Sequence, residues 1–302
     1  MVTMSIKKVL LVIVIALFFL LFLGILFSLL IEPSSAKSIP FLFGQVAIIE
    51  INGEIVSDKT TLINTNAFDI VDLLDRAEKD PGVAAILLEI NSPGGSVVAT
   101  KQIVEKIRTL KKPTVAWISD IGTSGAYYIA SACDLVIADE DSITGSIGVI
   151  SIVPNLSELL DKLGIRITVL KEGKYKDMGS IFSEMSDEEK TMIKSMLNQV
   201  YENFKKNVLE FRKGKIDAKK FEKIADGRLL TGKQALAYGL IDETGSREYA
   251  IKRAGELAGI TNPGVKRYAI KPESFYSLFS NAGQAFGSGF KQALIQQHFT
   301  IG

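Results

Sequence analysis

The stretch VAAILLEINSPGGSVVATKQIVEKIRTLKKPTVAWI, residues 83–118, carries the pattern that decides the fold. It opens with a largely apolar run at residues 83–90, interrupted only by Glu89, whose length fits a strand buried on both faces. Residues 91–95 contain one proline and two glycines and predict a turn. A helical pattern follows over residues 97–110, and residues 114–118 form a second apolar run. A strand, a helix and a second strand in this order predict a βαβ unit with parallel strands.

The alternation of strands and helices continues on both sides of this unit. Upstream, residues 46–51 form an apolar run interrupted only by Glu50, and residues 68–77 place their apolar side chains on one side of a helix. Downstream, we expect a helix at about residues 124–132 and strands at residues 135–138 and 147–153. This alternation predicts an α/β fold with a largely parallel sheet covered on both faces.

The later part of the chain is more helical. Ser186 and Glu189 have the spacing of a capping box, which predicts the start of a long helix that runs to about Phe211. No internal repeat is evident in the sequence. We therefore expect one domain over residues 45–270, followed by a C-terminal tail at residues 271–302.

The N-terminal part predicts a membrane anchor. Residues 9–31 contain no charged side chain and are long enough to cross a bilayer, since about 20 apolar residues suffice. Lys7 and Lys8 precede this run, and positive flanks stay in the cytoplasm. We expect a single-pass protein of the cell membrane, with residues 1–8 cytoplasmic, a linker at residues 32–44 and the catalytic domain outside the cytoplasm.

A cleaved signal peptide is the alternative interpretation of the same segment. Ser34-Ser35-Ala36 has the small-x-small form of a cleavage site. However, the apolar run is longer than the roughly 7–15 residues of the apolar core of a signal peptide. This length favours an uncleaved anchor.

The composition argues against several classes of partner and cofactor. Lys and Arg number 35 and Asp and Glu number 34, so no basic field points to nucleic acid. The single cysteine, Cys133, cannot form an intramolecular disulfide. The sequence has no clustered His, Cys and Asp residues for a metal and no phosphate-binding loop for ATP. We expect no metal and no cofactor.

A candidate nucleophile lies at a predicted boundary between a strand and a helix. Gly122-Thr123-Ser124-Gly125-Ala126 resembles a nucleophile elbow, in which small neighbours allow a tight turn and close substrate approach. A helix N-cap is the alternative role for Ser124, since serine is favoured there. The only histidine is His298, close to the chain end, which argues against a Ser-His-Asp triad. A lysine is the known alternative base.

The candidate base lies in the segment 171–177, after the apolar run at residues 167–170. A lysine can accept a proton at neutral pH only if an apolar site lowers its pKa. The segment contains three lysines, Lys171, Lys174 and Lys176, and composition does not choose among them.

Five motifs together resemble the signal peptide peptidase A family of serine proteases, which shares a clan with Clp protease and the crotonases. The resemblance covers about residues 46–258, and the motifs occur in the order and approximate spacing of the family. They are Ile90-Asn91-Ser92-Pro93-Gly94-Gly95, Thr123-Ser124-Gly125-Ala126-Tyr127-Tyr128, Thr144-Gly145-Ser146-Ile147-Gly148, Gly173-Lys174-Tyr175-Lys176-Asp177 and Ala225-Asp226-Gly227-Arg228.

The resemblance implies a role for each matching residue. Ser124 corresponds to the nucleophile, Lys176 to the general base, and Ser146 to a serine that hydrogen-bonds the lysine and holds its amine in place. The turn Gly94-Gly95 and the N–H of Gly125 correspond to the oxyanion hole, a role that unobstructed backbone donors can fill. Thr123 stands where the family often has the smaller alanine. The threonine side chain crowds the elbow but removes no catalytic group. The implied fold is the ClpP/crotonase spiral of ββα units.

The resemblance also implies a function. We expect a membrane-anchored serine endopeptidase that cleaves remnant signal peptides or other membrane-associated peptides. Short members with one copy of the motifs form homo-oligomeric rings, in which the serine and the lysine can come from adjacent subunits. Two alternatives are a crotonase-like acyl-CoA enzyme and a non-catalytic membrane scaffold. The anchor and the Ser/Lys pair argue against the acyl-CoA enzyme. The presence of Ser124, Ser146 and Lys176 argues against the scaffold.

Overall fold

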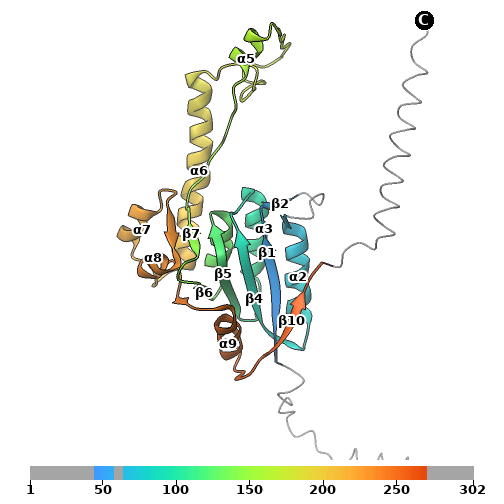
Figure 1. Cartoon of the computed structure of the whole chain (residues 1–302), viewed down its shortest axis with the longest axis vertical. Helices are drawn as coiled ribbons and strands as arrows, with labels where there is room; N and C mark the ends of the chain where they lie inside the picture. The colour runs from blue at the N-terminus through green and yellow to red at the C-terminus, as the bar shows by residue number, and fades with distance from the viewer. Residues whose placement is uncertain (1–43, 58–63, 271–302) are drawn as a thin grey trace, which may run out of the picture. The chain divides into compact units, whose positions relative to one another are not determined.

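The structure is a computed structural model that describes residues 44–57 and 64–270 (Figure 1). The expected membrane anchor at residues 9–31 and the C-terminal tail at residues 271–302 lie outside the described residues. Within the described ranges, no helix is both long and apolar enough to cross a membrane.

A mainly parallel sheet forms the centre of the domain. Its strand order is β10-β1-β4-β5-β6-β9, and each pairing along this path is parallel. Beside it, β7 pairs in parallel with β5 and antiparallel with β8, while β2 and β3 form a small second sheet. The strands are β1 (Gln45–Asn52), β2 (Ile55–Val56), β3 (Thr65–Asn66), β4 (Val83–Ser92), β5 (Thr114–Thr123), β6 (Leu135–Ala138), β7 (Ile143–Gly145), β8 (Leu229–Thr231), β9 (Glu243–Thr244) and β10 (Gly264–Tyr268).

Helices cover both faces of the sheet, as the sequence predicts (Figure 1). The helices α2 (Ala67–Lys79), α3 (Val97–Ile107) and α4 (Gly125–Ser131) share one apolar cluster with one face of the central strands. The helix α9 (Arg247–Leu257) packs on the other face, where alternate residues of the same strands form a second cluster. Because successive strand residues point to opposite faces, continuous apolar runs were needed to fill both clusters.

One predicted strand is wrong. Residues 147–153 form no strand, and the chain instead pairs at β7 (Ile143–Gly145), which starts four residues earlier. Ile147 is buried in the core, but Ile150 and Ile152 are 81 % and 80 % exposed, so no neighbouring strand covers the later part of this apolar run. An apolar run of this length indicates a buried strand only if a neighbouring strand is available to cover it.

Among the described residues the longest helix is α6 (Asp187–Phe211), and it begins with the predicted capping box. The Ser186 hydroxyl accepts from the Glu189 N–H, and the Glu189 carboxylate accepts from the Ser186 N–H. Only its last turns are buried, at Phe204, Lys205 and Val208. The short helices are α5 (Ser157–Lys162), α7 (Ala218–Ile224) and α8 (Gly232–Ala237).

We call residues 150–199 the arm. It contains α5 and the first half of α6, and none of its residues is buried (Figure 1). The arm therefore contributes nothing to the core of its own chain, although it is rich in apolar side chains.

A buried ion pair fixes the end of α6 to the sheet. Arg212 is 1 % exposed and donates to both carboxylate oxygens of Asp242, at 2.7 and 3.0 Å. Asp242 also accepts from the Val136 N–H in β6 at 2.8 Å and pairs with Lys215. Burial opposes ionisation of Asp242, but hydrogen bonds from Arg212 and Lys215 outweigh it and hold its pKa below the ordinary value. This pair ties the helix that carries the arm to the central sheet.

Candidate active site

Ser124 lies at the turn from β5 into α4, in a strained backbone conformation. Its φ is 53° and its ψ is −121°, which few residues other than glycine adopt. The Ser124 N–H donates to the Gly145 carbonyl at 2.9 Å, which secures the turn. The hydroxyl makes no capping hydrogen bond, although Ser124 occupies the N-cap position. The serine therefore stands there for a reason other than capping, and its strain marks a candidate functional residue.

The predicted oxyanion glycines lie beside this turn. A Cβ built on Gly125 would lie 3.4 Å from the Gly95 nitrogen, so the two N–H groups are neighbours. Within residues 44–57 and 64–270, neither of these N–H groups donates a hydrogen bond, whereas the Gly94 N–H donates to the Ser92 hydroxyl at 3.1 Å. Gly95 and Gly125 are thus the available donors, and Gly94 shapes the turn with its φ of 98°.

A side chain at Gly95 or Gly125 would collide with neighbouring atoms. A Cβ on Gly95 would lie 2.2 Å from the Ile55 carbonyl oxygen, and one on Gly125 would lie 2.6 Å from the Thr100 hydroxyl oxygen. The glycines therefore allow the turn at residues 94–95 to approach both β2 and the start of α4 closely enough to pair the two donors.

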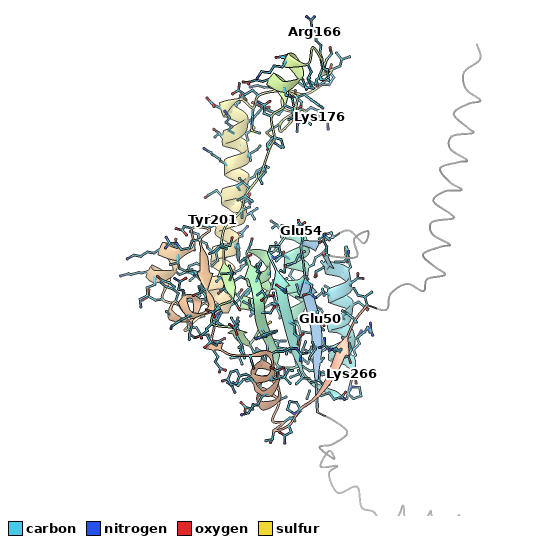
Figure 2. All side chains as sticks on the ribbon, viewed as in Figure 1. Glu50, Glu54, Arg166, Lys176, Tyr201 and Lys266 are labelled. Carbon is cyan, nitrogen blue, oxygen red and sulfur yellow. The ribbon has the colours of Figure 1, made fainter. Side chains whose placement is uncertain are left out.

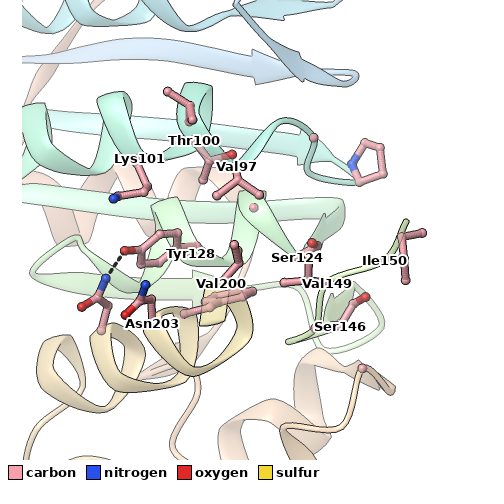
Figure 3. A pocket seen from close by; sticks show the side chains of 18 of the residues that line it. Val97, Thr100, Lys101, Ser124, Tyr128, Ser146, Val149, Ile150, Val200 and Asn203 are labelled. Carbon is pink, nitrogen blue, oxygen red and sulfur yellow. Dashed lines mark hydrogen bonds between the residues drawn. The ribbon is translucent and has the colours of Figure 1, made fainter. Parts of the chain in front are cut away.

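Ser124 and Ser146 open into one cavity of about 530 Å³ (Figure 3). This volume lies within the range of about 300–1,000 Å³ that is typical of ligand pockets. Figure 3 shows the two serines at one end and Lys101, Asn203 and Tyr128 at the other. The residues that line it include Val97, Val98, Val149, Ile150, Val200 and Phe204, so its walls are largely apolar.

One wall of the cavity comes from α6. Val200, Asn203 and Phe204 line it, and Asn207 donates a hydrogen bond to the Tyr128 hydroxyl across it. The motif Ala225-Asp226-Gly227-Arg228 supplies Asp226 and Gly227 next to Ser146. The sequence analysis did not predict the wall formed by α6. It did identify the motif at residues 225–228, which contributes the lining next to Ser146.

Lys176 does not line this cavity. It is exposed and lies on the arm, near α5 and away from the sheet (Figure 2). The structure thus brings together Ser124, Ser146 and the oxyanion glycines of one chain, but not the predicted base.

The three lysines of the segment 171–177 differ in their partners. Lys171 pairs with Asp177, and Lys174 pairs with Glu188 at 2.7 Å. The hydrogen bond to Glu188 raises the pKa of Lys174, so its amine stays protonated at neutral pH. In the part of the chain that the structure describes, the Lys176 ammonium has no ion pair and no hydrogen bond. Lys176 is therefore the lysine of this segment that is available to another site.

Cys133 does not compete for the role of nucleophile. Its side chain is buried, and burial raises the pKa of the thiol, so the reactive thiolate is disfavoured. The described residues also contain no group of three or more His, Cys, Asp and Glu side chains placed to hold a metal ion.

Comparisons with known proteins agree with this geometry. The model of peptidase family S49 matches residues 106–261, and the model of Clp protease matches residues 44–137. A candidate protease of Methanocaldococcus jannaschii is 39% identical over 227 residues, which cover 74% of this chain and 72% of that protein. A candidate signal peptide peptidase of Enterococcus faecium is 33% identical over 221 residues, which cover 72% of this chain and 64% of that protein.

A solved structure shares the fold. A serine-to-alanine mutant of the 1510-N membrane-bound stomatin-specific protease has a TM-score of 0.50 and 18% identity, and the match covers 76% of this chain and 99% of that one. At this identity the likeness concerns the fold alone. The S49 match and the two relatives carry the assignment: the chain belongs to peptidase family S49, the signal peptide peptidase A family of serine proteases.

Proposed function

We propose that this protein is a serine endopeptidase in which Ser124 is the nucleophile, Lys176 the general base and Ser146 the residue that holds the lysine amine. One observation carries the proposal. Ser124 has a strained backbone, its hydroxyl makes no capping hydrogen bond, and it lines the cavity next to the N–H groups of Gly95 and Gly125, which donate no hydrogen bond within the described residues. A nucleophile, an oxyanion hole and a substrate pocket are the parts that acyl transfer requires.

The proposed reaction follows the order of these parts. Neutral Lys176 takes the proton of the Ser124 hydroxyl, and the Ser124 oxygen attacks the carbonyl carbon of the peptide bond. The oxyanion accepts hydrogen bonds from the Gly95 and Gly125 N–H groups. The amine leaves with a proton from the lysine, and water then hydrolyses the acyl-enzyme with the lysine again as base.

We propose that Lys176 reaches Ser124 from an adjacent subunit of a homo-oligomeric ring. Two observations support this: Lys176 lies on the arm, and the cavity of one chain holds two serines but no nearby amine except Lys101 at its far end. The arm also exposes apolar side chains that a second copy would cover. They are Ile150, Ile152, Leu156, Leu159, Leu163, Ile165, Ile167, Val169, Leu170, Phe182 and Met196.

Docking of the arm on a neighbouring subunit would also place the proposed base in apolar surroundings. A lysine that is exposed to water is protonated at neutral pH, and it becomes a proton acceptor only after transfer to an apolar site. The walls of the cavity near Ser146 include Val149 and Ile150, which offer such surroundings. A cyclic assembly closes the set of contacts, because each subunit gives one arm and receives one.

We further propose that residues 9–31 anchor the protein in the cell membrane, with the catalytic domain outside the cytoplasm, and that the substrates are remnant signal peptides or other membrane-associated peptides. The apolar run with its preceding lysines supports the anchor and its orientation. The relative from Enterococcus faecium, which is described as a candidate signal peptide peptidase, supports the substrate class.

The test is labelling and turnover of the full-length protein. A fluorophosphonate probe should label the wild type at Ser124, and the protein should cleave an apolar fluorogenic peptide. Ser124→Ala should abolish both with little change in folding. Peptidase activity that survives in Ser124→Ala would refute the proposal. Binding of coenzyme A together with an unlabelled Ser124 would instead favour the crotonase-like alternative.

A further inference from the structure

The turn at residues 225–228 is built around one carboxylate. Asp226 accepts from the backbone N–H of Arg228 at 3.1 Å and from the Arg228 guanidinium at 2.8 and 2.6 Å. Gly227 turns the chain with a φ of 89°, and the Tyr201 hydroxyl of α6 donates to the Ala225 carbonyl. Asp226 thus binds both the main chain and the side chain of Arg228, which fixes the orientation of that residue.

The main chain of Arg228 in turn holds Ser146. The Arg228 carbonyl accepts from the Ser146 N–H at 2.8 Å. Ser146 has a φ of 49°, so its backbone is strained and needs external support to stay in place. The preceding residue, Gly145, accepts from the Ser124 N–H through its carbonyl. The two serines of the cavity are therefore linked through adjacent peptide groups, and the Arg228 carbonyl is the outer support of this link.

We propose that Asp226 is a positioning residue that acts through Ser146: it fixes the Arg228 carbonyl, which holds the strained backbone that aims the Ser146 hydroxyl. The proposal rests on the proposed function, because it requires that the hydroxyl of Ser146 hold the general base. Asp226 makes its hydrogen bonds to Arg228 and none to Ser124, so in this proposal its effect on catalysis passes through residue 146.

An ordinary stabilising role explains the arrangement less well. The side chains of Asp226 and Arg228 are both 49 % exposed, and exposed ion pairs contribute little to stability. The hydrogen bonds from Arg228 hold the pKa of Asp226 at about 2, so the carboxylate is ionised and keeps its geometry throughout the pH range of an assay. A pair that contributes little to folding but fixes a carbonyl against a strained serine has its main effect on geometry.

A double-mutant cycle tests the proposal on the full-length protein. Asp226→Ala should lower kcat by about tenfold with little change in KM, a loss typical of a misplaced catalytic group. Asp226→Asn should keep most of the activity, since its amide oxygen still accepts from the Arg228 N–H. In a Ser146→Ala background, Asp226→Ala should cost less than about twofold, because no hydroxyl remains to be aimed.

Asp217 supplies a matched control. As the N-cap of α7 it accepts from the N–H groups of Lys219 and Lys220 at 2.8 and 3.1 Å, and it makes no hydrogen bond to Ser146. Asp217→Ala should leave kcat unchanged, and sedimentation should show the same assembly for all variants.

The outcomes separate the two proposals. Wild-type kcat in Asp226→Ala, or a full tenfold loss that persists in the Ser146→Ala background, would overturn the role of Asp226 while Ser124 labelling and peptidase activity of the wild type leave the proposed function intact. A wild type that neither binds the fluorophosphonate at Ser124 nor cleaves peptides would overturn the proposed function, and this inference with it.

Discussion

Mixing the inactive variants Ser124→Ala and Lys176→Ala should restore part of the peptidase activity, in an amount that can be calculated from their proportions. Ser124 lies in the cavity of its own chain, whereas Lys176 lies on the arm, outside that cavity. If each site takes its serine from one subunit and its lysine from the next, Ser124→Ala and Lys176→Ala chains complement each other. A site is active when a chain with an intact serine stands next to a chain with an intact lysine on the side of the donated arm.

The expected recovery follows from random assembly. With a fraction x of Lys176→Ala chains, the fraction of active sites is x(1 − x), so a ring mixed in equal parts should show about one quarter of the wild-type activity. The curve should be a parabola that vanishes at both ends. The assay is cleavage of an apolar fluorogenic peptide after the two variants are co-assembled at a series of ratios.

A matched mixture distinguishes complementation from dilution. When Lys174→Ala replaces Lys176→Ala, every arm still carries an intact base, so activity should rise linearly with x and reach about one half in an equal mixture. Mixed oligomers that stay inactive at all ratios would refute the reasoning and would place both catalytic groups in one subunit. An active protein that sediments as a monomer would refute the ring itself.

Three further predictions concern single positions. Lys176→Ala should lower kcat by roughly 100-fold or more, as expected for loss of a general base, whereas alanine at either other lysine of the segment 171–177 should change peptidase turnover by less than about threefold. Asp242→Asn should lower the free energy of unfolding at pH 7 by about 3 kcal/mol in urea titrations, because it leaves the buried Arg212 guanidinium uncompensated. Since the folded state lowers the pKa of Asp242, the stabilisation is present above its unfolded pKa of about 3.9 and is lost as the pH falls; the variant should therefore show a flatter decline of stability in acid. Gly125→Ala should abolish turnover, because the new Cβ would lie 2.6 Å from the Thr100 hydroxyl oxygen, and Thr100→Ala should restore part of the thermal stability but not of the activity.

The central strands were predictable because the physics that forms them is local. β6 is a continuous apolar run and β4 contains one at residues 83–88, and such runs fill both faces of a parallel sheet. The start of α6 was predictable for a similar reason, since Ser186 and Glu189 satisfy the first backbone N–H groups at a fixed spacing.

Other elements form only by pairing with segments far away in the chain, which the local sequence does not predict. β10 has four exposed residues out of five and becomes a strand only by pairing with β1, far away in the chain. Residues 147–153 show the opposite error, because no strand pairs with them and Ile150 and Ile152 stay exposed, although Ile147 is buried. In both cases the hydrophobic pattern describes the polarity of the segment but does not predict which strand, if any, pairs with it.

The site was predictable to different depths. The glycines around Ser124 could be identified because only glycine fits backbones that approach so closely. Composition could not choose among the three lysines, since each has the same chemistry and the choice depends on partners. The ion pairs of Lys171 with Asp177 and of Lys174 with Glu188 supply that missing information. The wall formed by Val200 and Phe204 could not be predicted, because helical periodicity indicates a buried face but not what it covers.

The position of α6 connects substrate binding with the proposed assembly. Its last turns line the cavity and are fixed by Arg212 to the sheet, while its first turns belong to the arm that carries Lys176. At 1.5 Å per residue, its 25 residues extend over roughly 37 Å, so one rigid element reaches from the pocket of its own chain to the region that would meet a neighbour. A substrate that presses on Val200 or Phe204 would therefore act on the same helix that delivers the base to the next subunit. In a ring built this way, the proposed base meets apolar walls only where a neighbouring subunit receives the arm beside its serine.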